Sequence, residues 1–275
     1  MKTVDYGNLF DLEGRVVLLT GGGGYLGAQF ARGYAAHGAD VVIFDIDEAT
    51  GRSVAEAVTK EYGVKTRALM CDIADPDAVA TAVGEAWSEF GRIDVLHNNA
   101  ANQSSGLKAE FAPYEDFDIQ DWRQVVGVDL QGVFLTTQAV GRQMVEAGLR
   151  GSILQTSSIY GSFGADNRIY EGATLRGQQI CNPAVYSTVK AGSEGLVRWL
   201  ATYWAEHGIR VNALVPGGVE AGQNNTFKAR YSARVPLGRM ARADEVVGAA
   251  IFLASDAASY ITGQSLFVDG GLSAW

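Results

Sequence analysis

Short apolar runs rich in β-branched residues alternate along this chain with longer segments in which apolar residues recur at helical spacing. The apolar runs have the length of buried strands and end at glycine or polar residues. They lie at 15–20, 40–44, 66–71, 93–97, 152–156, 211–215 and 265–268, with helical segments such as 25–37, 75–90 and 184–207 between them. Strands that are apolar on both faces and separated by helices indicate a parallel sheet covered on each side.

The predicted fold class is therefore α/β. Because strand–helix–strand connections are nearly always right-handed, the alternation predicts a doubly wound, Rossmann-like parallel sheet of about seven strands, with helices on both faces in three layers. The composition does not change along the chain, so we expect one domain over 13–275 after an N-terminal arm at 1–12. Two irregular stretches, near 98–120 and 158–183, exceed the usual connection of about 2–6 residues and are candidate functional loops.

Composition and charge narrow the range of partners. The chain has 275 residues, of which 47% are hydrophobic, and a formal net charge of −9. It has no cluster of Lys and Arg, so we expect neither nucleic acid nor an anionic membrane as a partner. Cys71 and Cys181 lack metal-ligand spacing, so no metal site is expected, and two free thiols suit a reducing cytoplasm. The acids within MKTVDYGNLFDLEG argue against a signal peptide, which also favours a cytoplasmic protein.

Glycines gather in TGGGGYLG, at 20–27, between the first predicted strand and the first helix. A dinucleotide pyrophosphate binds at such a place, because bare backbone N–H groups at a helix N-terminus can approach it closely. A plain tight turn is the alternative. Asp45 ends the second strand, where a carboxylate can bind the adenosine ribose and repel a 2′-phosphate; no Arg follows at Ile46 or Asp47. This favours NAD over NADP, although Asp45 could also be an ordinary turn residue.

Further motifs follow in a defined order. They are CDIAD (71–75), NNAA (98–101), SSIYG (157–161), YSTVK (186–190), RVNALVPGG (210–218), PLGRM (236–240) and FLASDAASYITGQSLFVDGG (252–271). Together with the glycine turn, this series resembles the short-chain dehydrogenase/reductase family in its single-domain form, over nearly the whole chain. The resemblance implies an NAD(P)-dependent oxidoreductase that interconverts a secondary alcohol and a ketone by hydride transfer.

The resemblance also implies a set of cofactor contacts at the ends of the strands. Asp72 would bond the adenine amino group, Asn98 would bracket the cofactor, and 215–217 would lie against the nicotinamide. The implied cofactor-binding residues are Gly21, Gly24, Tyr25, Leu26, Gly27, Asp45, Ile46, Asp72, Ile73, Asn98, Ala100, Tyr186, Lys190, Pro216, Gly217 and Val219.

Tyr186 and Lys190 are four residues apart on a predicted helix, so both side chains project from one face. A free tyrosine has a pKa of about 10, and a nearby ammonium group together with a cationic nicotinamide favours its phenolate form. The phenolate could then take the hydroxyl proton while hydride leaves the same carbon. By resemblance, Lys190 would also hold ribose hydroxyls, and Ser158 would hydrogen-bond the substrate oxygen. The alternative reading is an ordinary, half-exposed helix face.

Other candidates for the chemistry are weaker. Ser157 is one residue out of register and is expected to point into the sheet. Tyr160 and Tyr170 have no Lys four residues later, but they could line the pocket. The three histidines His37, His97 and His207 are expected to be structural, because the chemistry of the family does not use histidine.

The sequence departs from the family pattern at four places. Tyr25 stands where single-domain members usually carry the middle glycine of the turn. Asp129 replaces an asparagine that supports a proton-relay water, and we include it among the catalytic candidates because its charge would act on Lys190 if the two are close. Ala221 replaces a threonine that often contacts the nicotinamide carboxamide. An insertion at about 164–183 lengthens the segment between Ser158 and Tyr186.

The polar character of the insertion and its surroundings suggests the substrate. The candidates include Arg176 and Gln103, and the residues expected to bind substrate are Tyr160, Arg168, Tyr170 and Gln223. Amides and arginines suit a sugar, sugar phosphate or sugar acid better than an apolar ketone. Alternatively, these residues are solvated or form subunit contacts. Two other functions stay open: a 3-oxoacyl thioester (acyl carrier protein) reductase and a non-catalytic NAD-binding scaffold or sensor.

Assembly is implied by the resemblance as well. Helices near 121–148 and 184–207 commonly pair between subunits in the family, and an exposed Trp275 would suit an interface. We therefore expect a homodimer or homotetramer that acts on a small molecule.

Overall fold

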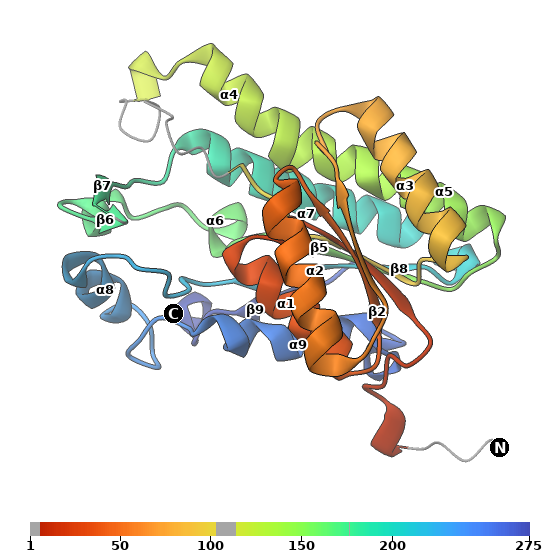
Figure 1. The fold of residues 1–275 in the computed structure, drawn as a ribbon. Helices are drawn as coiled ribbons and strands as arrows, with labels where there is room; N and C mark the ends of the chain where they lie inside the picture. Colours follow the sequence, from red (N-terminus) through yellow and green to blue (C-terminus); the bar gives the residue numbers. More distant parts are fainter. Residues whose placement is uncertain (1–5, 103–113, 176) are drawn as a thin grey trace.

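Seven parallel strands form the centre of the structure, a computed structural model that describes residues 6–102, 114–175 and 177–275 (Figure 1). The strands are β1 (Val16–Thr20), β2 (Asp40–Asp45), β3 (Thr66–Met70), β4 (Val95–Asn98), β5 (Ser152–Thr156), β8 (Arg210–Pro216) and β9 (Ser265–Val268). Their order across the sheet is β3-β2-β1-β4-β5-β8-β9, and every adjacent pair is parallel. The predicted doubly wound sheet is thereby confirmed.

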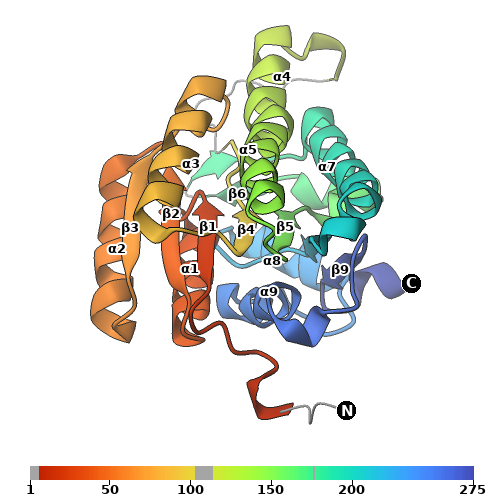
Figure 2. The same ribbon diagram turned by 90° about the vertical axis from the view of Figure 1, so that its right-hand side faces the viewer.

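Helices cover both faces of this sheet. They are α1 (Tyr25–Ala36), α2 (Glu48–Tyr62), α3 (Pro76–Phe90), α4 (Ile119–Val126), α5 (Val133–Glu146), α6 (Ile159–Ser162), α7 (Ala184–Tyr203), α8 (Asn225–Ser232) and α9 (Val247–Ala254). Figure 2 shows α3, α5 and α7 on one side of the sheet, with α1 and α9 on the other.

The alternation of strand side chains produces the two halves of the core. Leu18, Val42 and Phe44 pack with residues of α3, α5 and α7. Their neighbours Leu19 and Ile43 face the opposite way, toward α1, α2 and α9. Both faces of these central strands are therefore buried, which explains why the strands read as continuous apolar runs instead of alternating ones.

The winding reverses between β1 and β4, which lie side by side at the centre of the sheet. The backbone N–H groups of Asn99 and Ala100, just past β4, each donate to Thr20 Oγ1 at 3.0 Å. Ligands of open α/β sheets bind outside the carboxyl ends of the strands at this kind of switch point. The topology alone therefore indicates where to look for the site.

Two segments differ from the sequence-based expectation. The helix predicted over 184–207 ends at Tyr203, and a 3-10 turn follows at Ala205–His207. The stretch 158–183 is not irregular throughout, because it contains α6, a 3-10 turn at Asn167–Tyr170 and a small antiparallel hairpin of β6 (Thr174–Leu175) and β7 (Gln178–Gln179). Elements of two to four residues are too short to produce a recognisable hydrophobic periodicity in the sequence.

The described part of the N-terminal arm packs onto the sheet domain. Leu12 is fully buried and its N–H donates to His37 O at 2.8 Å, while Leu9 O accepts from Ala257 N at 3.0 Å. Within the residues that the structure describes, no helix is both long enough and apolar enough to cross a membrane.

Candidate active site

The glycine-rich turn lies at the switch point, and two of its glycines are required by packing. Gly21 has a positive φ of +65°, and a Cβ there would approach Ala100 Cα to 2.8 Å. A Cβ on Gly27 would overlap the carbonyl oxygen of Gly21. Gly24 is the N-cap of α1 and contributes no side-chain hydrogen bond, whereas α2 is capped by Asp47 and α3 by Asp75. The first N–H groups of α1 therefore have no side-chain cap, as pyrophosphate binding at a helix N-terminus requires.

Asp45 places one negative charge directly beside this turn. Its Oδ2 accepts a hydrogen bond from Gly23 N at 2.8 Å, and its Oδ1 accepts one from Asp47 N at 3.0 Å. The side chain of Ile46 is exposed at the same strand end. In the loop after β3, Asp72 is exposed and its Oδ1 accepts from Ala74 N at 2.9 Å.

Tyr25 connects the start of α1 with the loop that follows β8. It is the first residue of α1, and its hydroxyl donates to Glu220 O, in the loop after β8, at 2.9 Å. In that loop, Gly217 N donates to Val268 O at 3.0 Å, and Val219 forms a bridge with Ala241. The tyrosine that replaces the expected glycine thus ties the start of α1 to the segment that follows β8.

The side chain of Asn98 turns away from the sheet edge. Its Nδ2 donates to Thr137 Oγ1 at 2.9 Å and its Oδ1 accepts from Thr136 Oγ1 at 2.6 Å, both on α5. The side chain is buried and directed toward α5, so its placement does not support the expected contact with a cofactor. Asn99 and Ala100 are the residues of this segment that contact the glycine turn.

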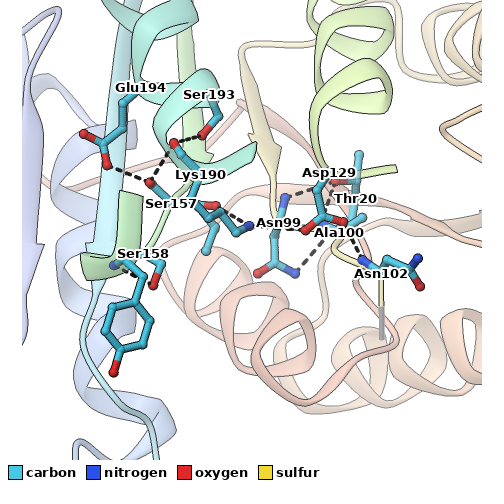
Figure 3. Close-up of polar contacts among 12 residues, drawn as sticks. Thr20, Asn99, Ala100, Asn102, Asp129, Ser157, Ser158, Lys190, Ser193 and Glu194 are labelled. Carbon is cyan, nitrogen blue, oxygen red and sulfur yellow. Dashed lines mark hydrogen bonds and ion pairs between the residues drawn. The ribbon is translucent and has the colours of Figure 1, made fainter. Parts of the chain in front are cut away.

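Lys190 is almost completely buried beside Tyr186 on α7. Its Nζ lies 5.6 Å from the centroid of the Tyr186 ring and donates to Thr156 O at 3.2 Å. On its other side, Asp129 Oδ2 is 3.8 Å away (Figure 3). Helix α7 therefore presents a phenol and a buried ammonium group side by side, with Thr156 O and Asp129 as the partners of the ammonium group.

Ser158 caps α6 at the end of β5. Its Oγ accepts a hydrogen bond from Tyr160 N at 3.2 Å (Figure 3). Because this bond uses the oxygen as an acceptor, the hydroxyl hydrogen can be donated to a substrate oxygen. The side chain is buried, so its position is well defined.

The other phenols of this region are held in their protonated form. Tyr160 and Tyr170 are joined by a hydroxyl–hydroxyl hydrogen bond of 3.3 Å. Burial raises the pKa of both groups. Both groups are therefore protonated near neutral pH and are unsuited to act as a base; Tyr170 donates its hydrogen to Tyr160, and the hydroxyl hydrogen of Tyr160 remains available as a donor.

His97 is a core residue. Its Nδ1 and Nε2 lie 2.9 Å from Tyr34 Oη and from Thr156 Oγ1, respectively. Burial lowers the pKa of His97 to about 3, so the ring is neutral at physiological pH. This agrees with the structural role expected for it.

Comparisons with known proteins identify the family of this chain. A solved structure described as a short-chain type dehydrogenase/reductase from Mycobacterium marinum is 32% identical, with a TM-score of 0.83, and the match covers 98% of this chain and 99% of that one. The chain belongs to the short-chain dehydrogenase/reductase family. It is accordingly an NAD(P)-dependent oxidoreductase that acts on CH–OH groups.

Relatives of this short-chain dehydrogenase/reductase are similar along nearly their whole length. The cis-4-hydroxycyclohexanecarboxylate dehydrogenase of Sinomonas cyclohexanicum is 39% identical over 94% of this chain and 97% of the relative. The D-threitol dehydrogenase of Mycolicibacterium smegmatis is 35% identical over 95% and 94%, respectively. A gluconate 5-dehydrogenase from Burkholderia cenocepacia, solved with NADP and tartrate, is 34% identical with a TM-score of 0.84 over 98% of both chains. The family model described as enoyl-(acyl carrier protein) reductase matches residues 25–273.

Asp129, one of the four places where this short-chain dehydrogenase/reductase departs from the family pattern, lies beside Lys190. It lies in a π-helix, Gly127–Gly132, and such helices are frequent at functional sites. Its Oδ1 accepts from Asn102 N at 2.6 Å, and its Oδ2 faces Lys190. Burial raises the pKa of Asp129, while the charge of Lys190 and the N–H of Asn102 oppose that shift.

The insertion of this family member is fastened to α8. Asn224, the N-cap of α8, makes two of the contacts: its Nδ2 donates to Gly172 O at 2.8 Å, and its backbone N–H donates to Thr174 O at 2.8 Å. Arg230 Nη1 donates to Arg168 O at 3.1 Å. The insertion and the segment after β8 are thus joined by several hydrogen bonds.

Two of the four residues expected to bind substrate have other partners. The side chain of Arg168 is 86% exposed and forms a double hydrogen bond with Asp166, at 2.7 and 2.9 Å. The amide of Gln223 closes its own loop by accepting from Ala221 N at 2.8 Å and donating to Val219 O at 3.0 Å. The expected substrate contact of Arg168 is not supported by this placement, and that of Gln223 would cost it its loop contacts. Arg176 and Gln103 lie outside the described residues.

Sequence reasoning missed one buried charge in this region. Glu194 lies one turn beyond Lys190 on α7 and is buried among serine hydroxyls. The spacing of Tyr186, Lys190 and Glu194, each four residues from the next, was the signal that could have identified it.

Proposed function

We propose that this enzyme interconverts a secondary alcohol and a ketone with Tyr186 as the group that exchanges the proton. The observation that carries the proposal is the buried ammonium of Lys190 beside the Tyr186 ring, 5.6 Å from its centroid. Tyr160 and Tyr170 instead have pKa values raised by burial. Because Lys190 lies beside Tyr186, we assign Tyr186 as the phenol that exchanges the proton.

Each group of the site has a separate role in the transfer of hydride and proton. A bound nicotinamide coenzyme supplies the acceptor or donor of the hydride. Ser158 donates its hydroxyl hydrogen to the substrate oxygen and stabilises the charge that develops there. In the oxidation direction, the Tyr186 phenolate takes the proton of the substrate hydroxyl, and in reduction the phenol returns it. Lys190 places its ammonium group beside the phenol and donates a hydrogen bond to Thr156 O.

We propose NAD as the preferred coenzyme. The carboxylate of Asp45 lies against the glycine turn and suits ribose hydroxyls, while it repels a 2′-phosphate. The first turn of α1, with no side-chain cap at Gly24, suits the pyrophosphate. Some related structures contain NADP, such as the gluconate 5-dehydrogenase from Burkholderia cenocepacia, so the preference requires a direct measurement.

The substrate we propose is a small polyhydroxylated or acidic alcohol, such as a sugar alcohol or sugar acid. The protonated phenol of Tyr160, which accepts a hydrogen bond from Tyr170, keeps its own hydroxyl hydrogen as a donor for a hydroxyl or carboxylate oxygen of the substrate. Relatives of this chain are named for D-threitol, gluconate and a hydroxycyclohexanecarboxylate, all of them polar alcohols. These names favour this class over a 3-oxoacyl thioester.

A substrate panel tests the proposal. Purified enzyme is mixed with NAD and, separately, D-threitol, gluconate and cis-4-hydroxycyclohexanecarboxylate, and NADH formation is recorded at 340 nm. A 3-oxoacyl thioester with NADH or NADPH is the competing assay. We expect turnover with at least one polar alcohol. Faster turnover of the thioester would favour the reductase alternative, and coenzyme binding without turnover of any alcohol would favour a scaffold.

We propose that Asp129 adjusts the pH dependence of this reaction. Its carboxylate, 3.8 Å from Lys190 Nζ, offsets part of the positive charge beside the Tyr186 phenol. In Asp129→Asn this offset is removed, so the acidic limb of the kcat/KM profile for alcohol oxidation should move to lower pH. Asp118→Asn, which removes an exposed acid that caps α4, should leave the limb in place. An unchanged or upward-shifted limb in Asp129→Asn would contradict this role.

We propose that the enzyme is a homodimer or homotetramer that uses the faces of α5 and α7. Trp199 and Tyr203 are exposed and stacked, with ring centroids 4.7 Å apart, and Phe134 is exposed across the same hollow. Exposed aromatic groups of this kind are typical of subunit interfaces. We also propose a cytoplasmic location, where the thiols of Cys71 and Cys181 stay reduced.

Trp199→Glu should lower the mass of the assembly in solution, because it would bury an unpaired carboxylate in the proposed subunit interface of α5 and α7. Light scattering coupled to size exclusion measures the mass. Tyr260→Glu, which changes a fully exposed aromatic residue outside these helices, is the matched control and should leave the mass unchanged. A wild-type enzyme that elutes at the mass of one chain would refute the proposed assembly.

A further inference from the structure

Glu194 is a buried carboxylate that the proposed chemistry does not use. Its side chain is 6% exposed. Ser157 Oγ donates to its Oε1 at 2.8 Å (Figure 3), and Ser162 Oγ and Ser265 Oγ each donate to its Oε2 at 3.1 Å. Burying a carboxylate costs free energy unless hydrogen bonds replace its water, and these three hydroxyls supply them. The end of β5, the end of α6 and β9 therefore meet at one side chain.

Successive turns of α7 hold successive residues at the end of β5. Lys190 Nζ donates to Thr156 O at 3.2 Å. Glu194, one turn later, accepts from Ser157, whose hydroxyl also lies 3.4 Å from Lys190 O. The next residue is Ser158, which caps α6. The backbone of the proposed catalytic serine is thus preceded by two residues that α7 holds in place.

Close packing at Gly161 restricts this arrangement further. A Cβ at Gly161 would lie 2.9 Å from Glu194 Oε1 and 3.0 Å from Ser157 Oγ. The short helix α6 therefore lies against α7 too closely for any side chain at this position. The hydroxyl of Ser157 is buried between α6 and α7 and is held by its hydrogen bond to Glu194 Oε1.

We propose that Glu194 is a positioning residue for Ser158, acting through Ser157 and Ser162. The inference rests on the proposed function, because it assumes that Ser158 binds the reacting oxygen. The carboxylate anchors both ends of the segment 157–162, and this anchoring sets where the Ser158 hydroxyl lies relative to Tyr186. Small displacements of a group that must meet the transition state reduce kcat more than they reduce substrate binding.

Kinetics of Glu194 variants test the inference. In Glu194→Leu, which keeps the volume and removes all three acceptor contacts, we expect kcat to fall about tenfold, with KM for the alcohol changed by less than about threefold and the NADH dissociation constant unchanged. Glu194→Gln retains one oxygen acceptor and should be intermediate, and it carries the test if the leucine variant does not fold. Ser152→Ala is the matched control, because it removes a buried hydroxyl bond to Leu253 O at the other end of β5. It should leave kcat unchanged.

Combination with Ser158→Ala separates positioning from general destabilisation. If Glu194 acts through Ser158, Glu194→Gln should reduce kcat much less in the Ser158→Ala background than in the wild type. An equal reduction in both backgrounds, or no reduction in the wild type, overturns the inference. If Ser158→Ala itself retains full activity, the proposed function of Ser158 fails, and any loss in Glu194→Gln then has a cause other than the one inferred.

Discussion

Tyr186→Phe is expected to lower kcat by about 10²- to 10⁴-fold, the usual contribution of a positioned proton-transfer group. The substitution removes one oxygen and keeps the ring that packs near Lys190 Nζ. Binding of the coenzyme should therefore change by no more than a few-fold. Steady-state kinetics with the best substrate of the panel, together with titration of NADH fluorescence, measures both quantities.

Tyr160→Phe is the comparison that isolates the role of the ammonium. Tyr160 is a neighbouring phenol with a pKa raised by burial, hydrogen-bonded to Tyr170 at 3.3 Å. Its loss should raise KM, because it removes a hydrogen-bond donor from the substrate site, while kcat changes less than in Tyr186→Phe. Equal losses of kcat in the two variants would mean that Lys190 does not single out Tyr186 as the base.

Asp45→Asn is expected to shift the coenzyme preference toward NADP by about 10- to 100-fold in the ratio of kcat/KM values. The wild-type carboxylate offers a charged hydrogen bond to ribose, worth about 1.5–3 kcal/mol, and each tenfold change in a ratio corresponds to about 1.4 kcal/mol. Asparagine keeps the shape and one acceptor oxygen, which can serve Gly23 N, now 2.8 Å from Oδ2, while its NH2 group replaces the oxygen that accepts from Asp47 N at 3.0 Å. The change therefore tests the charge more than the fold of the turn.

The matched control for this variant is Asp47→Asn. Asp47 lies two residues from Asp45, and its substitution by asparagine removes the same charge. Its carboxylate, however, caps α2 by accepting from Ala49 N and Thr50 N. We expect a small loss of stability and little change in coenzyme preference. A wild-type enzyme that already prefers NADP would show that Asp45 does not determine the choice.

The sequence by itself determined the sheet, the glycine turn and the pair on α7, because each depends on local spacing. Apolar runs of strand length predicted all seven strands of the central sheet to within about two residues at either end. The four-residue spacing of Tyr186 and Lys190 requires one helix face, and the structure places Nζ beside the ring. Local spacing likewise located Asp45 at the end of β2.

Only the tertiary structure decided which polar side chains face the site. Asn98 bonds to α5, Arg168 to Asp166 and Gln223 to its own loop, although their sequence positions resemble those of ligand-binding residues. The charge of Asp129 beside Lys190 and the three serines around Glu194 also depend on residues from distant segments. The physical reason is that a polar side chain takes the nearest partner that burial allows, and that partner belongs to another part of the chain, which spacing along the sequence does not reveal.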